Sequence, residues 1–162
     1  MVYMKQPPAD DVIACQTAMF EWAESYDTKD WDRFLANAAP TLLIDYRLLM
    51  DKYWEAIPSA EFIEMVKDPG FLGNPRVKSQ HFVGVSRFVQ ESEDYIIGTH
   101  QMRVTHQRYK DDELTEVQRR GHASGNCTVH YKRIEGVWKW AGLLPGIRWK
   151  EHEFDKIFYT YD

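Results

Sequence analysis

Two histidines and two tyrosines have the residue types and the pattern positions that proton-transfer chemistry needs. Imidazole titrates near neutrality, so His81 and His106 could take a proton from a carbon acid or give one to a departing hydroxyl. A phenol, with a pKa of about 10, stays protonated, so Tyr26 and Tyr46 could donate hydrogen bonds to a carbonyl oxygen. Asp27 directly follows Tyr26 and could orient one of these groups. The alternative for each of them is a hydrogen-bonded core residue.

The sequence gives little support for a metal site or a phosphate-binding site. His100 and His106 lie on one expected strand, roughly 20 Å apart at about 3.3 Å per residue, which is too far to hold one ion. The chain has no helical His-Glu-x-x-His, no paired-cysteine motif and no glycine-rich phosphate loop. We therefore expect neither a metal nor a cofactor. Cys15 and Cys127 are too few for a disulfide framework, and we expect both to be reduced and buried.

A helix must position the first tyrosine and the aspartate. Val12, Cys15, Met19, Trp22 and Tyr26 recur at steps of three and four, which places them on one face of a helix from about residue 10 to residue 26. The phenol of Tyr26 therefore points where the apolar stripe points. We expect Trp22 to line a binding pocket beside it.

The hydrophobic periodicity, together with capping, proline and glycine residues, predicts the other helices and strands. Asp30 can cap a short second helix that stops before Pro40, and Pro58-Ser59 opens a third helix that ends at Asp68-Pro69-Gly70. Residues 42–46 alternate as a half-buried strand with Tyr46 on the apolar side. An irregular loop is expected over 71–80, and strands over 81–90, 95–109, 116–132 and 137–144.

Strand parity decides which histidines point inward. On the strand 95–109, His100 and His106 share the apolar face with Ile96, Met102 and Val104. On the strand before it, the two faces are less clearly distinguished. His81 shares a face with Val83, Val85 and Val89, but the opposite face carries Phe82 and Phe88.

Helices followed by antiparallel strands predict an α+β fold in which a curved, mostly antiparallel sheet packs around the N-terminal helices. A chain of 162 residues fits a single domain, residues 1–162. A net charge of −5 argues against nucleic acid as a partner. Residues 1–10 contain no apolar stretch, so we expect no signal peptide, no membrane partner and an intracellular, cytoplasmic or endosomal location.

Six segments in order resemble the scytalone dehydratase family of fungal melanin enzymes: SYDTKDWDRF, LLIDYR, QHFVG, VTHQRYKD, GVWKWAGLLPGIRW and EFDKIF. The likeness runs from about Met19 to Phe158. It implies a cone-shaped α+β barrel of the cystatin-like group, usually a homotrimer, that needs neither metal nor organic cofactor. It also implies elimination of water from a cyclic β-hydroxy ketone of polyketide origin, with residues 146–162 as a C-terminal lid.

The resemblance also implies roles for individual residues. Tyr26 and Tyr46 would hold a water against the substrate carbonyl. His81 and His106 would handle the carbon proton and the leaving hydroxyl, and Asp27 would orient the imidazole side. The positions that wall the pocket in the family correspond here to Leu49, Met65, Phe154 and Phe158.

Two positions depart from the family pattern. Where the family carries a serine that supports a histidine and an asparagine that binds the departing hydroxyl, an ungapped match places Gly125 and Cys127. A one-residue bulge would bring Ser124 and Asn126 inward instead, and alternation favours the unbulged register. With Gly125 and Cys127 inward, the pocket would be wider and less polar. The substrate would then be a larger aromatic polyketide, for example a dihydroanthracenone.

Two rival functions stay open. The first is a polyketide cyclase or ketosteroid-isomerase-like enzyme on the same fold, which would use Asp27 or one histidine as a lone base. The second is a non-catalytic domain that binds a small ligand and keeps the tyrosines for affinity. A product lighter by one water would separate the dehydratase from both.

Overall fold

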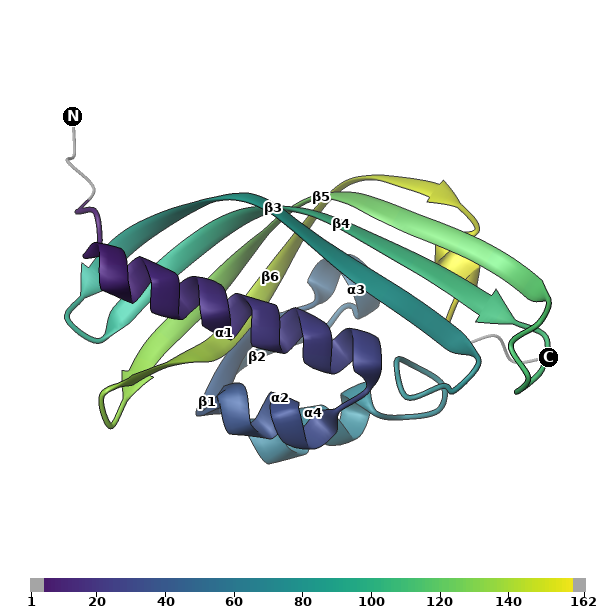
Figure 1. Cartoon of the computed structure of the whole chain (residues 1–162), viewed down its shortest axis with the longest axis horizontal. Helices are drawn as coiled ribbons and strands as arrows, with labels where there is room; N and C mark the ends of the chain where they lie inside the picture. Colours follow the sequence, from purple (N-terminus) through teal and green to yellow (C-terminus); the bar gives the residue numbers. More distant parts are fainter. Residues whose placement is uncertain (1–4, 159–162) are drawn as a thin grey trace.

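A long first helix lies along one face of a curved sheet (Figure 1). The computed structural model describes residues 5–158. Helix α1 (Ala9–Thr28) begins after Pro8, and Asp10 and Asp11 in its first turn suit the positive end of the helix dipole. It ends at Lys29, whose φ of 59° is left-handed. The predicted helix is confirmed and continues two residues past Tyr26.

The buried face of α1 contains the predicted apolar residues and also small residues that lie between the large ones. Val12 lies at the half-buried start of the stripe. The buried residues of α1 are Cys15, Ala18, Met19, Trp22, Ala23, Ser25 and Tyr26. The Trp22 ring stacks on Trp140 of the sheet at a centroid distance of 5.8 Å, which anchors the helix over the sheet.

The sheet is six-stranded, open and mostly antiparallel, in the order β2-β1-β6-β5-β4-β3. Among the strand pairs of residues 5–158, only β1–β6 is parallel. The strands are β1 (Ala38–Asp45), β2 (Tyr53–Pro58), β3 (Val77–Ser92), β4 (Tyr95–Tyr109), β5 (Val117–Ile134) and β6 (Val137–His152). The predicted α+β class and the curved antiparallel sheet are confirmed.

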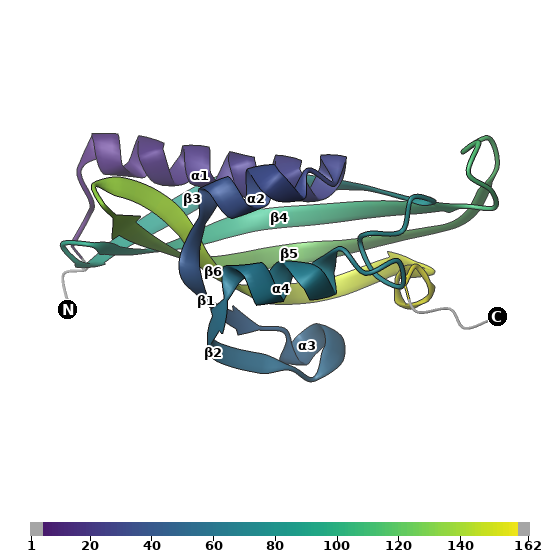
Figure 2. The ribbon, with the colours of Figure 1, turned by 90° about the horizontal axis from the view of Figure 1, so that it is seen from below.

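Shorter helices pack beside α1 and beside the β1–β2 edge of the sheet (Figure 2). They are α2 (Trp31–Asn37), α3 (Arg47–Met50) and α4 (Ser59–Val66), and the single 3-10 turn η1 (Phe154–Lys156) follows β6. The carboxylate of Asp30 accepts the backbone N–H of Arg33 and caps α2 as expected. Phe34 of α2 and Phe62 of α4 pack at 6.1 Å, so these two helices meet through aromatic side chains.

Several predicted boundaries are wrong. Strand β3 already begins at Val77, within the expected loop, and β6 continues to His152 instead of ending at Leu144. Helix α3 and strand β2 were not predicted, because 47–57 has neither a clear period of two nor one of 3.6. Tyr46 lies one residue past the end of β1 but is buried, and its N–H donates to Lys52 O.

A bulge divides β3 into two parts: odd-numbered side chains face inward before it, and even-numbered side chains face inward after it. Val83 pairs with Met102 whereas Ser86 pairs with His100, so β3 has one more residue than β4 between these pairs. His81 and Val83 therefore face inward before the bulge, and Ser86 and Phe88 face inward after it. Simple alternation, which would keep Val85 and Val89 on the face of His81, therefore fails beyond Val83, and Val85 is 79% exposed.

The helices of the described chain contain no segment that is both long enough and apolar enough to cross a membrane. Both cysteines, Cys15 and Cys127, are unbonded and buried, as the sequence predicts. Burial raises the pKa of each thiol to about 12, so both thiols are uncharged at neutral pH.

Candidate active site

A cavity of about 280 Å³ lies between α1, the inner face of β4–β6 and the segment after β6. Its polar groups include two histidines and two tyrosines, and most of the rest of its wall is apolar. The residues that line it are Trp22, Tyr26, Tyr46, Leu49, Met50, Phe71, Leu72, His81, Met102, Val104, His106, Ala123, Ser124, Gly125, Asn126, Cys127, Leu143, Pro145, Gly146, Ile147, Phe154, Asp155 and Phe158. Such a lining suits a mostly apolar ring system with a few polar substituents.

Asp27 lies outside the cavity wall and forms a hydrogen bond with His81, which lines the cavity. The Asp27 Oδ1 lies 2.6 Å from His81 Nδ1, and its Oδ2 accepts the backbone N–H of His81 at 2.8 Å. Gln80 Nε2 donates to the same Oδ2 at 3.2 Å. A carboxylate can only accept, so His81 carries its proton on Nδ1 and presents the lone pair of Nε2. The pair has the geometry of an oriented general base.

His106 lies beside His81 on the neighbouring strand β4, with 6.4 Å between the ring centroids. Its Nδ1 is 2.7 Å from the Ser79 hydroxyl on β3. Burial, with the nearby His81, His122 and Lys29, lowers the His106 pKa from about 6.5 to about 3. The imidazole of His106 is therefore uncharged at neutral pH.

Two buried tyrosines also line the cavity. The Tyr26 hydroxyl is fully buried and makes no hydrogen bond of normal geometry within residues 5–158, although the Tyr46 hydroxyl and Trp22 indole are near enough to affect its pKa. Burial above all, and then Tyr46, holds the Tyr26 pKa well above its usual value. A protonated phenol in the cavity wall can donate a hydrogen bond to a ligand oxygen.

The structure brings most of the predicted site residues together. His81, His106, Tyr26, Tyr46, Trp22, Leu49, Gly125, Cys127, Phe154 and Phe158 all line the cavity. Asp27 lies outside the wall and acts on the cavity through His81. Met65 does not line the cavity: it lies on α4, is half-buried and packs against the core, and Phe71 and Leu72 from the following loop line the wall instead.

The register of β5 follows alternation where it meets β4. Gly125 pairs with Met102 and Cys127 pairs with His100, with no shift between β4 and β5 from Gly121 to Lys132. Cross-strand partners share a face, so Gly125 and Cys127 are on the inner face, as the sequence favours. The bulge is on β6, where Ser124 pairs with Trp149 but Gly125 pairs with Ile147. Ser124 and Asn126 also contribute atoms to the wall.

Gly125 does not widen the cavity as expected, because β6 fills the space of its missing side chain. A Cβ at Gly125 would lie 2.1 Å from Gly146 O and 2.9 Å from Arg148 N. Both are backbone atoms of the bulged segment and cannot move aside cheaply. The glycine therefore serves the close approach of β5 and β6, and the expectation of a wider pocket at this position is wrong.

Replacing Gly125 with serine is expected to destabilise the fold rather than restore a polar pocket group. Forcing a Cβ into this backbone contact should lower the free energy of unfolding by at least ~1–3 kcal/mol, which chemical denaturation would measure. Gly84→Ala is the matched control, because its Cβ would meet Gln101 Cβ at 3.3 Å and need only a small adjustment. Equal stabilities of the two variants would contradict this explanation.

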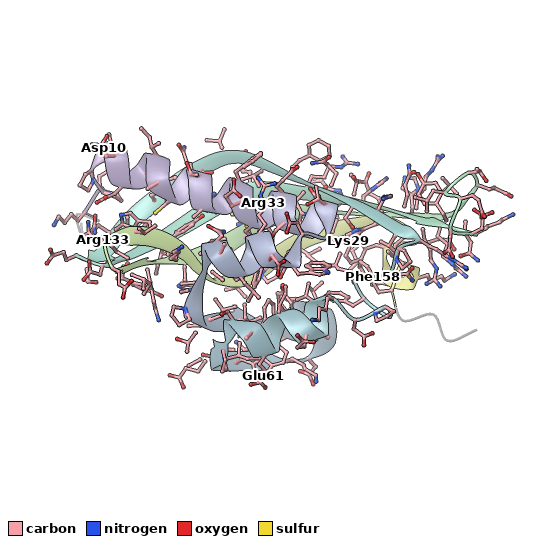
Figure 3. All side chains as sticks on the ribbon, turned by 60° about the horizontal axis from the view of Figure 1, so that its bottom comes forward. Asp10, Lys29, Arg33, Glu61, Arg133 and Phe158 are labelled. Carbon is pink, nitrogen blue, oxygen red and sulfur yellow. The ribbon has the colours of Figure 1, made fainter. Side chains whose placement is uncertain are left out.

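The segment after β6 covers one end of the cavity. Residues 146–152 of the predicted lid continue strand β6, and of these Gly146 and Ile147 line the cavity. Phe154 and Phe158 lie over His106 at ring distances of 5.8 and 5.0 Å. Figure 3 shows Phe158 on the same side of the molecule as Lys29 at the end of α1. Residues 159–162 of the predicted lid lie outside the described residues.

Another histidine, His100, forms hydrogen bonds with residues of the neighbouring strands β3 and β5. The His100 Nδ1 is 2.7 Å from the Ser86 hydroxyl, and its Nε2 is 2.8 Å from the Tyr131 hydroxyl. Burial lowers the His100 pKa to about 4. A separate cavity of about 320 Å³ between α1 and β3 reaches His100 and the far side of the Asp27–His81 pair. His100 does not line the first cavity, so we interpret this network as structural.

The buried histidines should make the protein acid-sensitive. A histidine whose pKa is lower in the folded than in the unfolded protein stabilises the fold fully above about pH 6.5, and this contribution is lost as the pH falls toward the folded value. We therefore expect Tm to fall between about pH 6.5 and pH 4, driven by His106 and His100. Thermal unfolding at a series of pH values would measure it. His106→Asn should give a shallower slope, and an unchanged slope would contradict the assignment.

Sequence reasoning missed Ser79, Phe71 and Leu72. Ser79 is two residues before His81, and strand alternation would have placed both on one face had the strand been expected to begin at Val77. No periodic signal marks Phe71 and Leu72, because they lie in an irregular loop. Within residues 5–158, no three or more histidine, cysteine, aspartate or glutamate side chains are grouped so that they could hold a metal ion.

Comparison with known proteins decides the family. The model of the family described as scytalone dehydratase matches residues 8–161. The chain belongs to the scytalone dehydratase family. A protein called scytalone dehydratase from Pyricularia oryzae is 53% identical over 148 residues, which cover 91% of this chain and 86% of that one. Dehydratase AgnL8 from Paecilomyces divaricatus is 57% identical over 154 residues, which cover 95% and 88%.

Solved structures share the fold of this scytalone dehydratase family member at much lower identity. The Kfla4162 protein from Kribbella flavida has a TM-score of 0.74 at 13% identity, covering 88% of this chain and 93% of that one. A hexachlorocyclohexane dehydrochlorinase, LinA type 3 from Novosphingobium barchaimii, has a TM-score of 0.70 at 14% identity, covering 88% and 90%. At these identities the similarity concerns the fold alone. The family assignment places the chain among the dehydratases, which are lyases.

Proposed function

We propose that this protein eliminates water from a cyclic β-hydroxy ketone of polyketide origin. The observation that carries the proposal is the carboxylate-bound His81 beside His106 in the wall of a cavity that two tyrosines also line. Elimination next to a ketone needs a base for the carbon proton, a donor to the leaving oxygen and a donor to the carbonyl oxygen. The cavity contains a group suited to each.

His81 is the group best suited to take the carbon proton. Its Nδ1–H donates to Asp27, so Nε2 carries the lone pair, and the carboxylate stabilises the imidazolium that forms. The electron pair of the broken C–H bond forms the new double bond as the C–O bond breaks. The hydroxide leaves with the proton of the imidazolium and becomes water, which returns His81 to its starting state.

The tyrosines and His106 stabilise the charges that develop during this reaction. Tyr26 and Tyr46, directly or through a water, donate hydrogen bonds to the carbonyl oxygen and acidify the adjacent C–H bond. His106 is uncharged, because its pKa is lowered to about 3, so it contributes a hydrogen bond to the leaving oxygen rather than a full proton. Phe154 and Phe158 shield this step from water.

The substrate we propose has an aromatic ring fused to the reacting ring, as in scytalone and vermelone or in a larger tricyclic dihydroanthracenone. Cys127 supports the larger substrate, because a neutral thiol is a small apolar wall residue at the position where the family resemblance implies an asparagine. Gly125 gives no such support, because the β6 backbone fills its side-chain space.

Incubation of the purified protein with scytalone, vermelone and a dihydroanthracenone, followed by mass spectrometry, tests the proposal. We expect at least one product that is lighter than its substrate by one water, and none with the His81→Asn variant. A product of unchanged mass would instead favour an isomerase. Binding of all three compounds without turnover would favour a ligand-binding domain.

A further inference from the structure

Ser79 and His106 form a cross-strand pair at the edge of the cavity. The two residues are direct partners in the β3–β4 register, so their side chains leave the sheet on the same face. The Ser79 Oγ lies 2.7 Å from His106 Nδ1. Since Nδ1 is held by Ser79, Nε2 is the ring nitrogen left for a molecule in the cavity.

The direction of this hydrogen bond determines what His106 can do. If the Ser79 hydroxyl donates to Nδ1, the imidazole proton is on Nε2 and can be donated into the cavity. If Nδ1–H donates to Ser79, then Nε2 is an acceptor and the serine proton needs another partner. No other hydrogen bond of the Ser79 hydroxyl is found within residues 5–158. The first arrangement therefore satisfies both groups with one bond.

A second serine–histidine pair on the same strands provides a comparison. Ser86 and His100 are also partners in the β3–β4 register and also lie 2.7 Å apart at Nδ1. The Ser86 hydroxyl, however, donates to Gly84 O at 3.2 Å, and the Tyr131 hydroxyl reaches His100 Nε2. Ser86 is therefore free to accept from Nδ1–H while Tyr131 donates to Nε2. The same pairing therefore favours opposite tautomers of the two histidines, because the other partners of the two serines differ.

We propose that Ser79 is a positioning residue that holds His106 as the Nε2–H tautomer and makes it a hydrogen-bond donor to the leaving oxygen. The part of this proposal that concerns the leaving oxygen rests on the proposed dehydratase function. Asp27 holds His81 as the opposite tautomer, with an acceptor at Nε2. The cavity thus contains one imidazole acceptor and one imidazole donor with 6.4 Å between the ring centroids, as an elimination requires.

Nitrogen NMR of the ligand-free protein tests the tautomer without any substrate. With 15N-labelled histidine at neutral pH, His106 should show a protonated Nε2 and an unprotonated Nδ1, and His100 should show the reverse. Ser79→Ala should shift the His106 tautomer ratio by about tenfold toward Nδ1–H, the effect expected for one lost hydrogen bond. A protonated Nδ1 in the unaltered protein, or an unchanged ratio in Ser79→Ala, would overturn the proposal. This result is independent of whether any tested compound is dehydrated.

Kinetics with a substrate that loses water tests the role of the tautomer. Ser79→Ala should lower kcat about tenfold with KM changed less than about twofold, and Ser79→Thr, which keeps a hydroxyl, should restore most of kcat. Ser86→Ala is the matched control, because it removes a bond of equal length to a histidine outside the cavity. Its kcat should stay within about twofold of the unaltered enzyme. Equal losses in the two alanine variants, or no rescue by threonine, would overturn the positioning role.

Discussion

Replacing Asp27 with asparagine is expected to lower kcat by ~10³- to 10⁴-fold while the protein stays folded. The Asp27 carboxylate accepts from His81 Nδ1, from the His81 backbone N–H and from Gln80. Asparagine has one acceptor oxygen and one donor nitrogen. If its oxygen keeps the backbone N–H, its amide nitrogen faces His81 Nδ1 and donates to it. The imidazole proton then moves to Nε2, and the base is lost.

Steady-state kinetics with any substrate that the enzyme dehydrates would measure this loss. Asp112→Asn is the matched control, because Asp112 also binds a basic side chain, with Arg76 Nε at 2.7 Å, but lies on the exposed surface. Its kcat should equal that of the unaltered protein. A fall of less than about tenfold in Asp27→Asn would show that the carboxylate does not control the His81 tautomer.

Replacing either tyrosine with phenylalanine is expected to lower kcat by ~10²- to 10³-fold, the usual effect of losing one donor to a developing oxyanion. KM should change much less, because the hydrogen bond strengthens as charge develops on the carbonyl oxygen. Tyr26→Phe removes only the contacts of this hydroxyl with Tyr46 and Trp22, so the free energy of unfolding should fall by no more than about 1 kcal/mol. Activity and stability should therefore separate in this variant.

Tyr131→Phe is the control for the tyrosine variants. The Tyr131 hydroxyl is buried and bound to His100 Nε2 at 2.8 Å, away from the first cavity. Its loss leaves a buried nitrogen unsatisfied and should cost about 1–3 kcal/mol of stability without lowering kcat at temperatures where the protein is folded. Chemical denaturation and kinetics on the same samples would measure both quantities. A destabilised but fully active Tyr26→Phe would contradict the role proposed for Tyr26.

Much of this site was predictable because its residues obey local periods. The step of three and four in α1 places Trp22 and Tyr26 on the buried face, since a helix repeats every 3.6 residues. The period of two places His106 on the inner face of β4, whose predicted bounds agree with the structure. The register of β5 against β4, with Gly125 and Cys127 inward, also follows from alternation.

Contacts between different helices and strands could not be predicted from short-range patterns in the sequence. Asp27 and His81 are separated by 54 residues, and their hydrogen bond depends on how α1 crosses β3. The bulges in β3 and β6 interrupt the period of two. The β3 bulge reverses the parity after Val83, and the β6 bulge brings the Gly146 carbonyl into the side-chain space of Gly125.

By itself, then, the sequence determined the long helix α1, the long strands and the inner faces of α1 and β4, because each depends on a repeat of only a few residues, whereas α3 and β2 have no such repeat. Tertiary structure decided the partners: Asp27 for His81, Ser79 for His106, and β6 backbone for Gly125. Partners depend on strand register and helix crossing, which are set by packing of the whole core rather than by neighbours along the chain.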